Sequence, residues 1–240
     1  IPEVQVEGLT RKMGMNRKTV HSYSKEFLGD YGHVRDSLVV EATWLGNPEP
    51  NQKVMINSYI GTMMEQSKQD DLIKAYDMQP FEVKAQDPKR TICEKIMSLV
   101  RFSHSENPVE DLKKKIRHLY DLHQLIENAQ CREFLESDNF NKMLHIVAVD
   151  DIRSYKNDNK WLEIHPKEAI IFSRLDELWK HLEAEYNGDY KYLVYGDLPD
   201  SAKVRQSLEH IKTEIDKLNW VIKLEQDLKK EQKIGTKIIR

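Results

Sequence analysis

Four charged side chains stand in two segments whose other residues are mostly apolar. Lys95 and Arg101 belong to the first segment, and Arg117 and Asp121 belong to the second. Burying such charges costs free energy unless they meet each other or a charged ligand. Lysine offers a compact point charge and arginine a planar fork, and phosphates are bound by both. The two segments therefore indicate either internal ion pairs or a site for a phosphorylated ligand.

The spacing of the first pair leaves both interpretations open. On an ideal helix, Lys95 and Arg101 are separated by about 9 Å of rise and lie about 120° from eclipsed. They need not share a face, although two long side chains can converge on one extended triphosphate. Spacing alone favours a surface helix on which both cations snorkel to solvent.

The second pair has a spacing that puts its members next to each other. Arg117 and Asp121 stand at i and i+4, so they are neighbours on one helix face. An intrahelical salt bridge is one interpretation. In the other, Asp121 orients Lys95 or Arg117, or accepts a proton from an attacking hydroxyl. His118 and His123 have a spacing that does not suit two ligands on one helix, and we expect both to be either partly exposed or packing residues with satisfied hydrogen bonds.

The first third of the chain mixes strand and loop patterns. Residues 34–45 are β-branched and apolar enough for a strand, and Pro48 and Pro50 end it because proline lacks a backbone donor. Residues 81–85 alternate in polarity and predict a short strand. Residues 54–64 fit either a second strand or the start of a helix.

The chain after residue 90 reads as helix. Thr91 and Glu94 have the spacing of a capping box, in which both side chains satisfy free backbone donors at a helix start. Asn107 as cap and Pro108 at the first helical position predict the start of the next helix. Its apolar stripe consists of Leu112, Ile116, Leu119, Tyr120, Leu122 and Ile126. Similar stripes predict helices over residues 140–149, 175–186 and 200–220.

Length and composition predict a helix-rich, soluble protein of one large domain or two smaller ones. The 240 residues are 39% hydrophobic and 32% charged, with a formal net charge of −3, so any contact with a polyanion must be a local patch. No run approaches the about 18 apolar residues of a membrane span, and we expect a cytoplasmic protein. Cys93 and Cys131 lack metal-ligand spacing, which favours buried free thiols.

The two charged segments resemble the second half of the AbiEii/AbiGii nucleotidyltransferase toxin family. In that family a helix with Glu-Lys and a later Arg precedes a helix that reads Arg-x-x-x-Asp-Leu, and the two helices line a nucleotide site. This chain has Lys95 and Arg101 in the first helix and Arg117 and Asp121 in the second. It departs mildly at Leu119, where an aromatic residue is common.

The resemblance runs from about residue 34 to about residue 218 and implies an α+β fold that is mostly α. A remnant of a polymerase-β-like nucleotidyltransferase sheet would be followed by a helical bundle lobe. The expected division is a partial α/β lobe over residues 1–88 and a helical lobe over residues 89–220. Residues 221–240 would form a Lys-rich C-terminal helix or tail.

The resemblance also implies an activity and roles for residues. Members use a nucleoside triphosphate (NTP) and Mg²⁺ to move a nucleotidyl group to a cellular target such as tRNA. A cognate antitoxin restrains them, and several act in phage defence. Lys95 and Asp121 would be catalytic, and Lys95, Arg101 and Arg117 would bind the nucleotide. Glu41 is either a further metal ligand or a solvent-facing glutamate on a strand.

One part of the family pattern is missing from the sequence. The family's metal site needs a Gly-Ser or Gly-Gly turn and an Asp-x-Asp pair, and neither occurs in the 240 residues. We expect this part to precede Ile1 in the parent protein, and we expect the chain alone to be unable to bind the metal pair or transfer nucleotides. The alternative function is a non-catalytic helical module that binds an antitoxin, RNA or a nucleotide.

Overall fold

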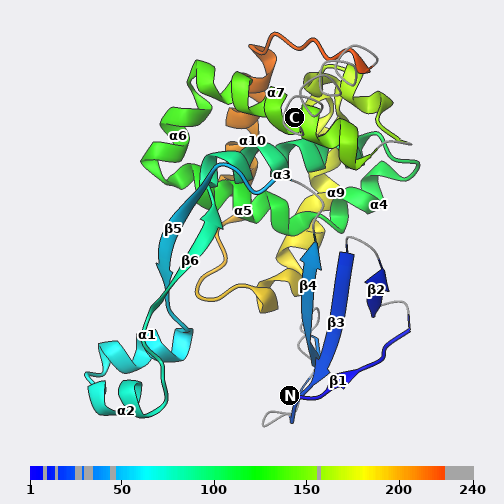
Figure 1. Cartoon of the computed structure of the whole chain (residues 1–240). Helices are drawn as coiled ribbons and strands as arrows, with labels where there is room; N and C mark the ends of the chain where they lie inside the picture. The colour runs from blue at the N-terminus through cyan, green and yellow to red at the C-terminus, as the bar shows by residue number, and fades with distance from the viewer. Residues whose placement is uncertain are drawn as a thin grey trace, which may run out of the picture.

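The chain folds into a helical body with two small antiparallel sheets, as seen in the computed structural model (Figure 1). The described residues are 1–7, 10–13, 16–24, 29, 35–43, 47–155 and 158–224. The expectation of an α+β fold that is mostly α is confirmed. No helix in these ranges is both long and apolar enough to cross a membrane.

The first sheet is built around strand β3 (Asn16–Ser22). Strand β4 (Ser37–Thr43) pairs with β3 along its whole length, from Ser22 opposite Ser37 to Asn16 opposite Thr43. Strands β1 (Glu3–Val4) and β2 (Arg11–Met13) share the other edge of β3. Strand β4 confirms the centre of the strand predicted over residues 34–45, whose positions 34, 44 and 45 lie outside the described residues.

The second sheet is a hairpin that extends from the helical body as an arm (Figure 1). Strand β5 (Asn51–Ile56) pairs with strand β6 (Phe81–Gln86), and helices α1 (Tyr59–Gln66) and α2 (Asp70–Ala75) form the tip. The ambiguous region 54–64 contains both elements. The strand gives way to helix α1 because the Ser58 hydroxyl accepts a hydrogen bond from the backbone N–H of Gly61 at 2.9 Å.

The helical body is arranged around helix α3 (Pro88–Ser103), which packs against five other helices. These are α4 (Pro108–Lys113), α5 (Ile116–Glu127), α6 (Ala129–Leu135), α7 (Asp138–Ser154) and α8 (Ile170–Ser173). Helices α9 (Leu175–Asn187) and α10 (Ser201–Asp216) complete the body, with short 3-10 turns at Lys160–Glu163, Pro166–Glu168 and Asp189–Leu193.

The predicted capping box of Thr91 and Glu94 is wrong, because α3 begins earlier. Asp87 caps the helix by accepting a hydrogen bond from the backbone N–H of Lys89 at 2.8 Å, and Pro88 occupies the first turn. The Thr91 hydroxyl donates instead to the side-chain oxygen of Gln86 at 3.0 Å. Lys95 therefore lies in the middle of the helix.

Other helices differ from the prediction in extent. The helix predicted from Pro108 onward is two helices, because α4 ends at Lys113 and α5 begins at Ile116. Helix α6 was not predicted, and α7 is longer than the predicted 140–149. The predicted helices over 175–186 and 200–220 correspond to α9 and α10. Both cysteines are buried and free, as expected. The division at residue 88 stays a prediction, and residues 225–240 lie outside the described ranges.

Replacing a buried leucine of α3 tests how much the body depends on this helix. Leu99 is 0% exposed, so Leu99→Ala should lower the free energy of unfolding by about 2–5 kcal/mol through lost burial and the cavity left behind. Leu72→Ala on the arm removes the same atoms from a side chain that is 42% exposed. This substitution should change the free energy of unfolding by less than about 0.5 kcal/mol. Urea denaturation measures both. Equal losses would contradict the central role of α3.

Candidate functional site

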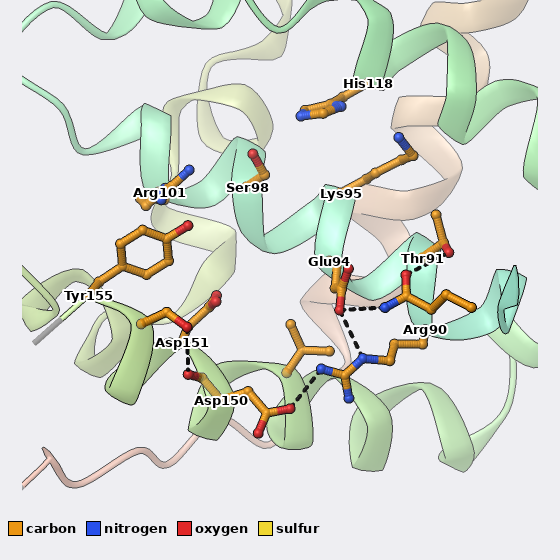
Figure 2. Close-up of a pocket in the computed structure, with 13 residues that line it drawn as sticks. Arg90, Thr91, Glu94, Lys95, Ser98, Arg101, His118, Asp150, Asp151 and Tyr155 are labelled. Carbon is orange, nitrogen blue, oxygen red and sulfur yellow. Dashed lines mark hydrogen bonds and ion pairs between the residues drawn. The ribbon is translucent and has the colours of Figure 1, made fainter. Parts of the chain in front are cut away.

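A cavity of about 480 Å³ lies on the outer face of α3, between α5 and α7 (Figure 2). Helix α3 supplies the largest share of its lining, Gln86 comes from β6 and His118 from α5. The other lining residues come from the last two turns of α7 and from Tyr155, which caps the end of that helix. The lining residues are Gln86, Arg90, Thr91, Glu94, Lys95, Ser98, Arg101, His118, Val147, Asp150, Asp151, Ser154 and Tyr155.

The amphipathic pattern of α3 turns its polar side chains toward this cavity. The inner face is fully packed, with Ile92, Ile96 and Leu99 each 0% exposed. Residues at intervals of three and four share one side of a helix, so the positions left on the outer side form one row. That row contains Thr91, Glu94, Ser98 and Arg101, all of which are only partly buried.

The structure joins the two charged segments through one ion pair. Lys95 Nζ lies 2.6 Å from Asp121 Oδ2, and both side chains are partly buried. Asp121 thus pairs with a cation of another helix. The i, i+4 salt bridge with Arg117 is not among the ion pairs of the described residues, and the Arg117 side chain is exposed. Of the two interpretations of Asp121, the geometry favours the one in which it orients Lys95.

The charges of four cations act on His118 at the α5 side of the cavity, and two of them, Lys95 and Arg101, line the cavity with it. Burial lowers the pKa of His118 to about 3, and the nearby charges of Lys95, Lys115, Arg117 and Arg101 lower it further. His118 is therefore neutral and adds no charge. Its Nδ1 atom is buried and has no hydrogen-bond partner among the described residues. This side of the cavity combines a positive field with an unused polar group, as expected for an anion site.

Aromatic rings hold two of these cations in place. The Arg101 guanidinium lies 4.0 Å from the ring centre of Tyr155 and 4.7 Å from that of Phe102. Lys115 Nζ lies 4.5 Å from the Phe102 ring. Burial and the neighbouring arginines lower the pKa of Lys115, which shows that the cations crowd one another. Sequence reasoning missed Lys115, although the run of lysines before Arg117 could have signalled it.

Arg90 forms a second charged network that sequence reasoning also missed. Its side chain is 1% exposed, and it donates from Nε to Glu94 at 2.8 Å and from Nη2 to Asp150 at 2.7 Å (Figure 2). Gln86 adds a hydrogen bond to Glu94 at 2.9 Å. The network connects α3 to α7, and its buried guanidinium has both carboxylates as compensation. The i, i+4 spacing of Arg90 and Glu94 was the available signal.

Asp151 differs from the other carboxylates of the cavity. Among the described residues its carboxyl group has no hydrogen bond and no ion pair with a base, although Arg101 is near enough to act on its charge. Burial raises the pKa of Asp151 to about 7, and the charges of Glu94 and Asp150 act in the same direction, while Arg101 opposes them. The group is therefore balanced between its two protonation states near neutral pH.

Glu41 lies outside this cavity. It is on β4, where its carboxylate is 3.5 Å from Lys18 Nζ of β3 and its side chain is 52% exposed. Its role as a metal ligand stays a prediction. The described residues contain no group of three or more His, Cys, Asp or Glu side chains that could hold a metal ion. Glu94 and Asp150 are both bonded to Arg90, so these carboxylates do not fit a magnesium site.

The raised pKa of Asp151 predicts a pH-dependent stability. The folded chain binds this proton more tightly than the unfolded chain, whose pKa is near 3.8, so the contribution is full below pH 3.8 and is lost as the pH rises through 7. Asp151→Asn removes this ionisable group and with it the pH-dependent contribution to stability. Relative to the wild type, the variant should gain about 4 kcal/mol of unfolding free energy over this range, because the shift covers about three pKa units.

Urea denaturation at several pH values measures the difference between Asp151→Asn and the wild type. The exposed Asp158→Asn corrects for the general loss of one negative charge. A difference that stays constant from acid to neutral pH would contradict the raised pKa.

Comparison with known proteins gives one match. The sequence model of a protein family described as nucleotidyl transferase AbiEii toxin, type IV TA system, matches residues 3–214. No curated protein and no solved structure matches the chain. The match includes both charged segments, the arm and most of the helical body.

Proposed function

The chain belongs to the AbiEii nucleotidyl transferase toxin family of type IV toxin–antitoxin systems, and we propose that its cavity on α3 binds a nucleoside triphosphate for nucleotidyl transfer. The observation that carries this proposal is the set of four cations whose charges act on His118. Lys95 and Arg101 line the cavity beside His118, and Lys115 and Arg117 are near enough to add their charge to the same side and to lower the pKa of that imidazole. A polyphosphate is the ligand that compensates such a group.

In this proposal the protein's own residues position and neutralise the phosphates. The ion pair with Asp121 fixes the ammonium of Lys95, and the rings of Tyr155 and Phe102 fix the guanidinium of Arg101. Preorganised cations stabilise the negative charge that develops on the leaving phosphates without reorganising during the reaction. Mg²⁺ is the expected cofactor together with the NTP, but Glu94 and Asp150 are both bonded to Arg90, so the part proposed for this cavity is to hold the phosphates.

The acceptor and the partners follow from family membership as further proposals. The nucleotidyl group would go to a cellular target such as tRNA, and the transfer would inhibit growth as part of phage defence in the cytoplasm. A cognate antitoxin would counteract this activity. Nucleotide binding without transfer is a second candidate function, and it is favoured by the bonds of Glu94 and Asp150 to Arg90, which occupy two carboxylates of the cavity.

Replacing Lys95 tests the phosphate site. Lys95→Ala removes a charge-assisted contact worth about 1.5–3 kcal/mol, so the affinity for the preferred NTP should fall at least about tenfold. Isothermal titration calorimetry with each of the four NTPs and Mg²⁺ measures the change. Lys53→Ala on the arm removes a lysine from a similar ion pair, with Glu82 at 2.8 Å, and should leave the affinity unchanged.

Nucleotidyl transfer is assayed with the whole polypeptide that the gene encodes. Labelled NTP should modify RNA or protein from the host cell, and Lys95→Ala and Asp121→Ala should abolish both transfer and growth inhibition while the variants remain folded. Binding without label transfer would support the second candidate function. Unchanged affinity and unchanged growth inhibition in Lys95→Ala would refute the nucleotide site.

A further inference from the structure

The carboxyl groups around the cavity differ in whether they already accept a hydrogen bond from a basic side chain. Glu94 and Asp150 each accept a hydrogen bond from the buried Arg90, at 2.8 and 2.7 Å. Asp121 accepts one from Lys95 at 2.6 Å. Asp151 alone in this group has no such bond among the described residues, although it lines the same cavity. It is therefore the carboxyl group with free acceptor capacity for a bound molecule.

Asp151 also lies where a reacting molecule would be in contact with the cations. Asp151 lies in the last turn of α7, four positions before Tyr155, which caps the end of that helix. Both side chains extend toward the row of α3 that carries Ser98 and Arg101 (Figure 2). The charged groups that act on Asp151 are Arg101, Glu94 and Arg90 from α3 and Asp150 from its own helix. Tyr155 is the other titratable group beside it.

The surroundings leave Asp151 able to take up and release a proton near neutral pH. Burial raises the pKa of Asp151 to about 7; the charges of Arg101 and Arg90 lower this pKa, and those of Glu94 and Asp150 raise it. A group that acts as a general base works best when its pKa is near the operating pH. A perturbed carboxyl in a cleft is a candidate for that role when its position also fits.

We propose that Asp151 is the general base of the transfer and that Asp121 is a positioning residue. This inference rests on the proposed function. The hydroxyl oxygen of the acceptor attacks the α-phosphorus of the NTP and forms the new O–P bond. The bond from the α-phosphorus to the bridging oxygen breaks, and pyrophosphate leaves with that electron pair. The hydroxyl proton passes to the carboxylate of Asp151, which later releases it to water.

Asp121 is not proposed as the group that accepts the hydroxyl proton, because it is already part of an ion pair. Its Oδ2 atom already holds the ammonium of Lys95 at 2.6 Å. Protonating that carboxylate during the reaction would weaken the pair that orients Lys95 on the phosphates. Asp151 can accept a proton without disturbing any hydrogen bond of the described residues, so the two acids have separate tasks.

The test is the pH dependence of transfer by the polypeptide as its gene encodes it. With labelled NTP and host RNA or protein, the single-turnover rate of the wild type should rise with pH and level off above about pH 7. Asp151→Asn should lower the rate by about 10²–10⁴-fold and flatten the profile while leaving the NTP affinity unchanged. Asp151→Glu should restore part of the rate and the rising limb.

Asp150→Asn is the matched control because it changes the same side chain one position away. It removes a partner of Arg90, so it should lower stability but keep the rising limb of the pH profile. A rising limb that survives in Asp151→Asn overturns the inference. So does a limb that disappears only in Asp121→Asn, which would make Asp121 the base.

The outcomes also separate this inference from the proposed function. If Lys95→Ala loses NTP binding and transfer while Asp151→Asn keeps the wild-type profile, the proposed function stands and the inference falls. If the wild type neither binds NTP nor transfers label, both fall. Loss of the limb in Asp151→Asn with retained NTP affinity supports both.

Discussion

Burial of the inner face of α3 is the constraint on which the rest of the structure depends. Ile92, Ile96 and Leu99 are fully enclosed by the helices around them, so the rotation of α3 about its axis is fixed. An amphipathic helix held in this way has no freedom to hide its remaining polar residues. The row from Thr91 to Arg101 must face outward, Lys95 must face α5, and Arg90 must face α7.

The charges that follow from this arrangement are distributed unequally across the cavity. Toward α7, the buried Arg90 is matched by the carboxylates of Glu94 and Asp150, so that side is internally compensated. Toward α5, the charges of four cations act on a neutral His118, and Asp121 compensates only Lys95 directly. An anion with several charges is therefore attracted to the α5 side of the cavity and finds no excess of positive charge on the α7 side. This asymmetry orients a nucleoside triphosphate in the proposed site, with its phosphates beside α5.

Local sequence patterns predicted the helices well where the signal was repetitive and poorly where it depended on a single residue. The stripes of α9 and α10 predicted both helices because five or more apolar residues agree on one face. The start of α3 was misplaced because Asp87 and Thr91 are both good caps, and Pro88 after Asp87 decides between them. The break between α4 and α5 falls within a run of three lysines, whose helix propensity gives no stop signal.

The sequence by itself determined the helical class of the body, the two charged segments and the family to which they point. It also determined that Arg117 and Asp121 could meet, because i, i+4 neighbours are set by the helix alone. Only the tertiary structure decided that Asp121 pairs with Lys95, 26 positions away, and that Arg90 pairs with Asp150, 60 positions away. It also gave Asp151 its raised pKa. Ion pairing between helices and desolvation depend on which surfaces pack together, and no local pattern contains that information.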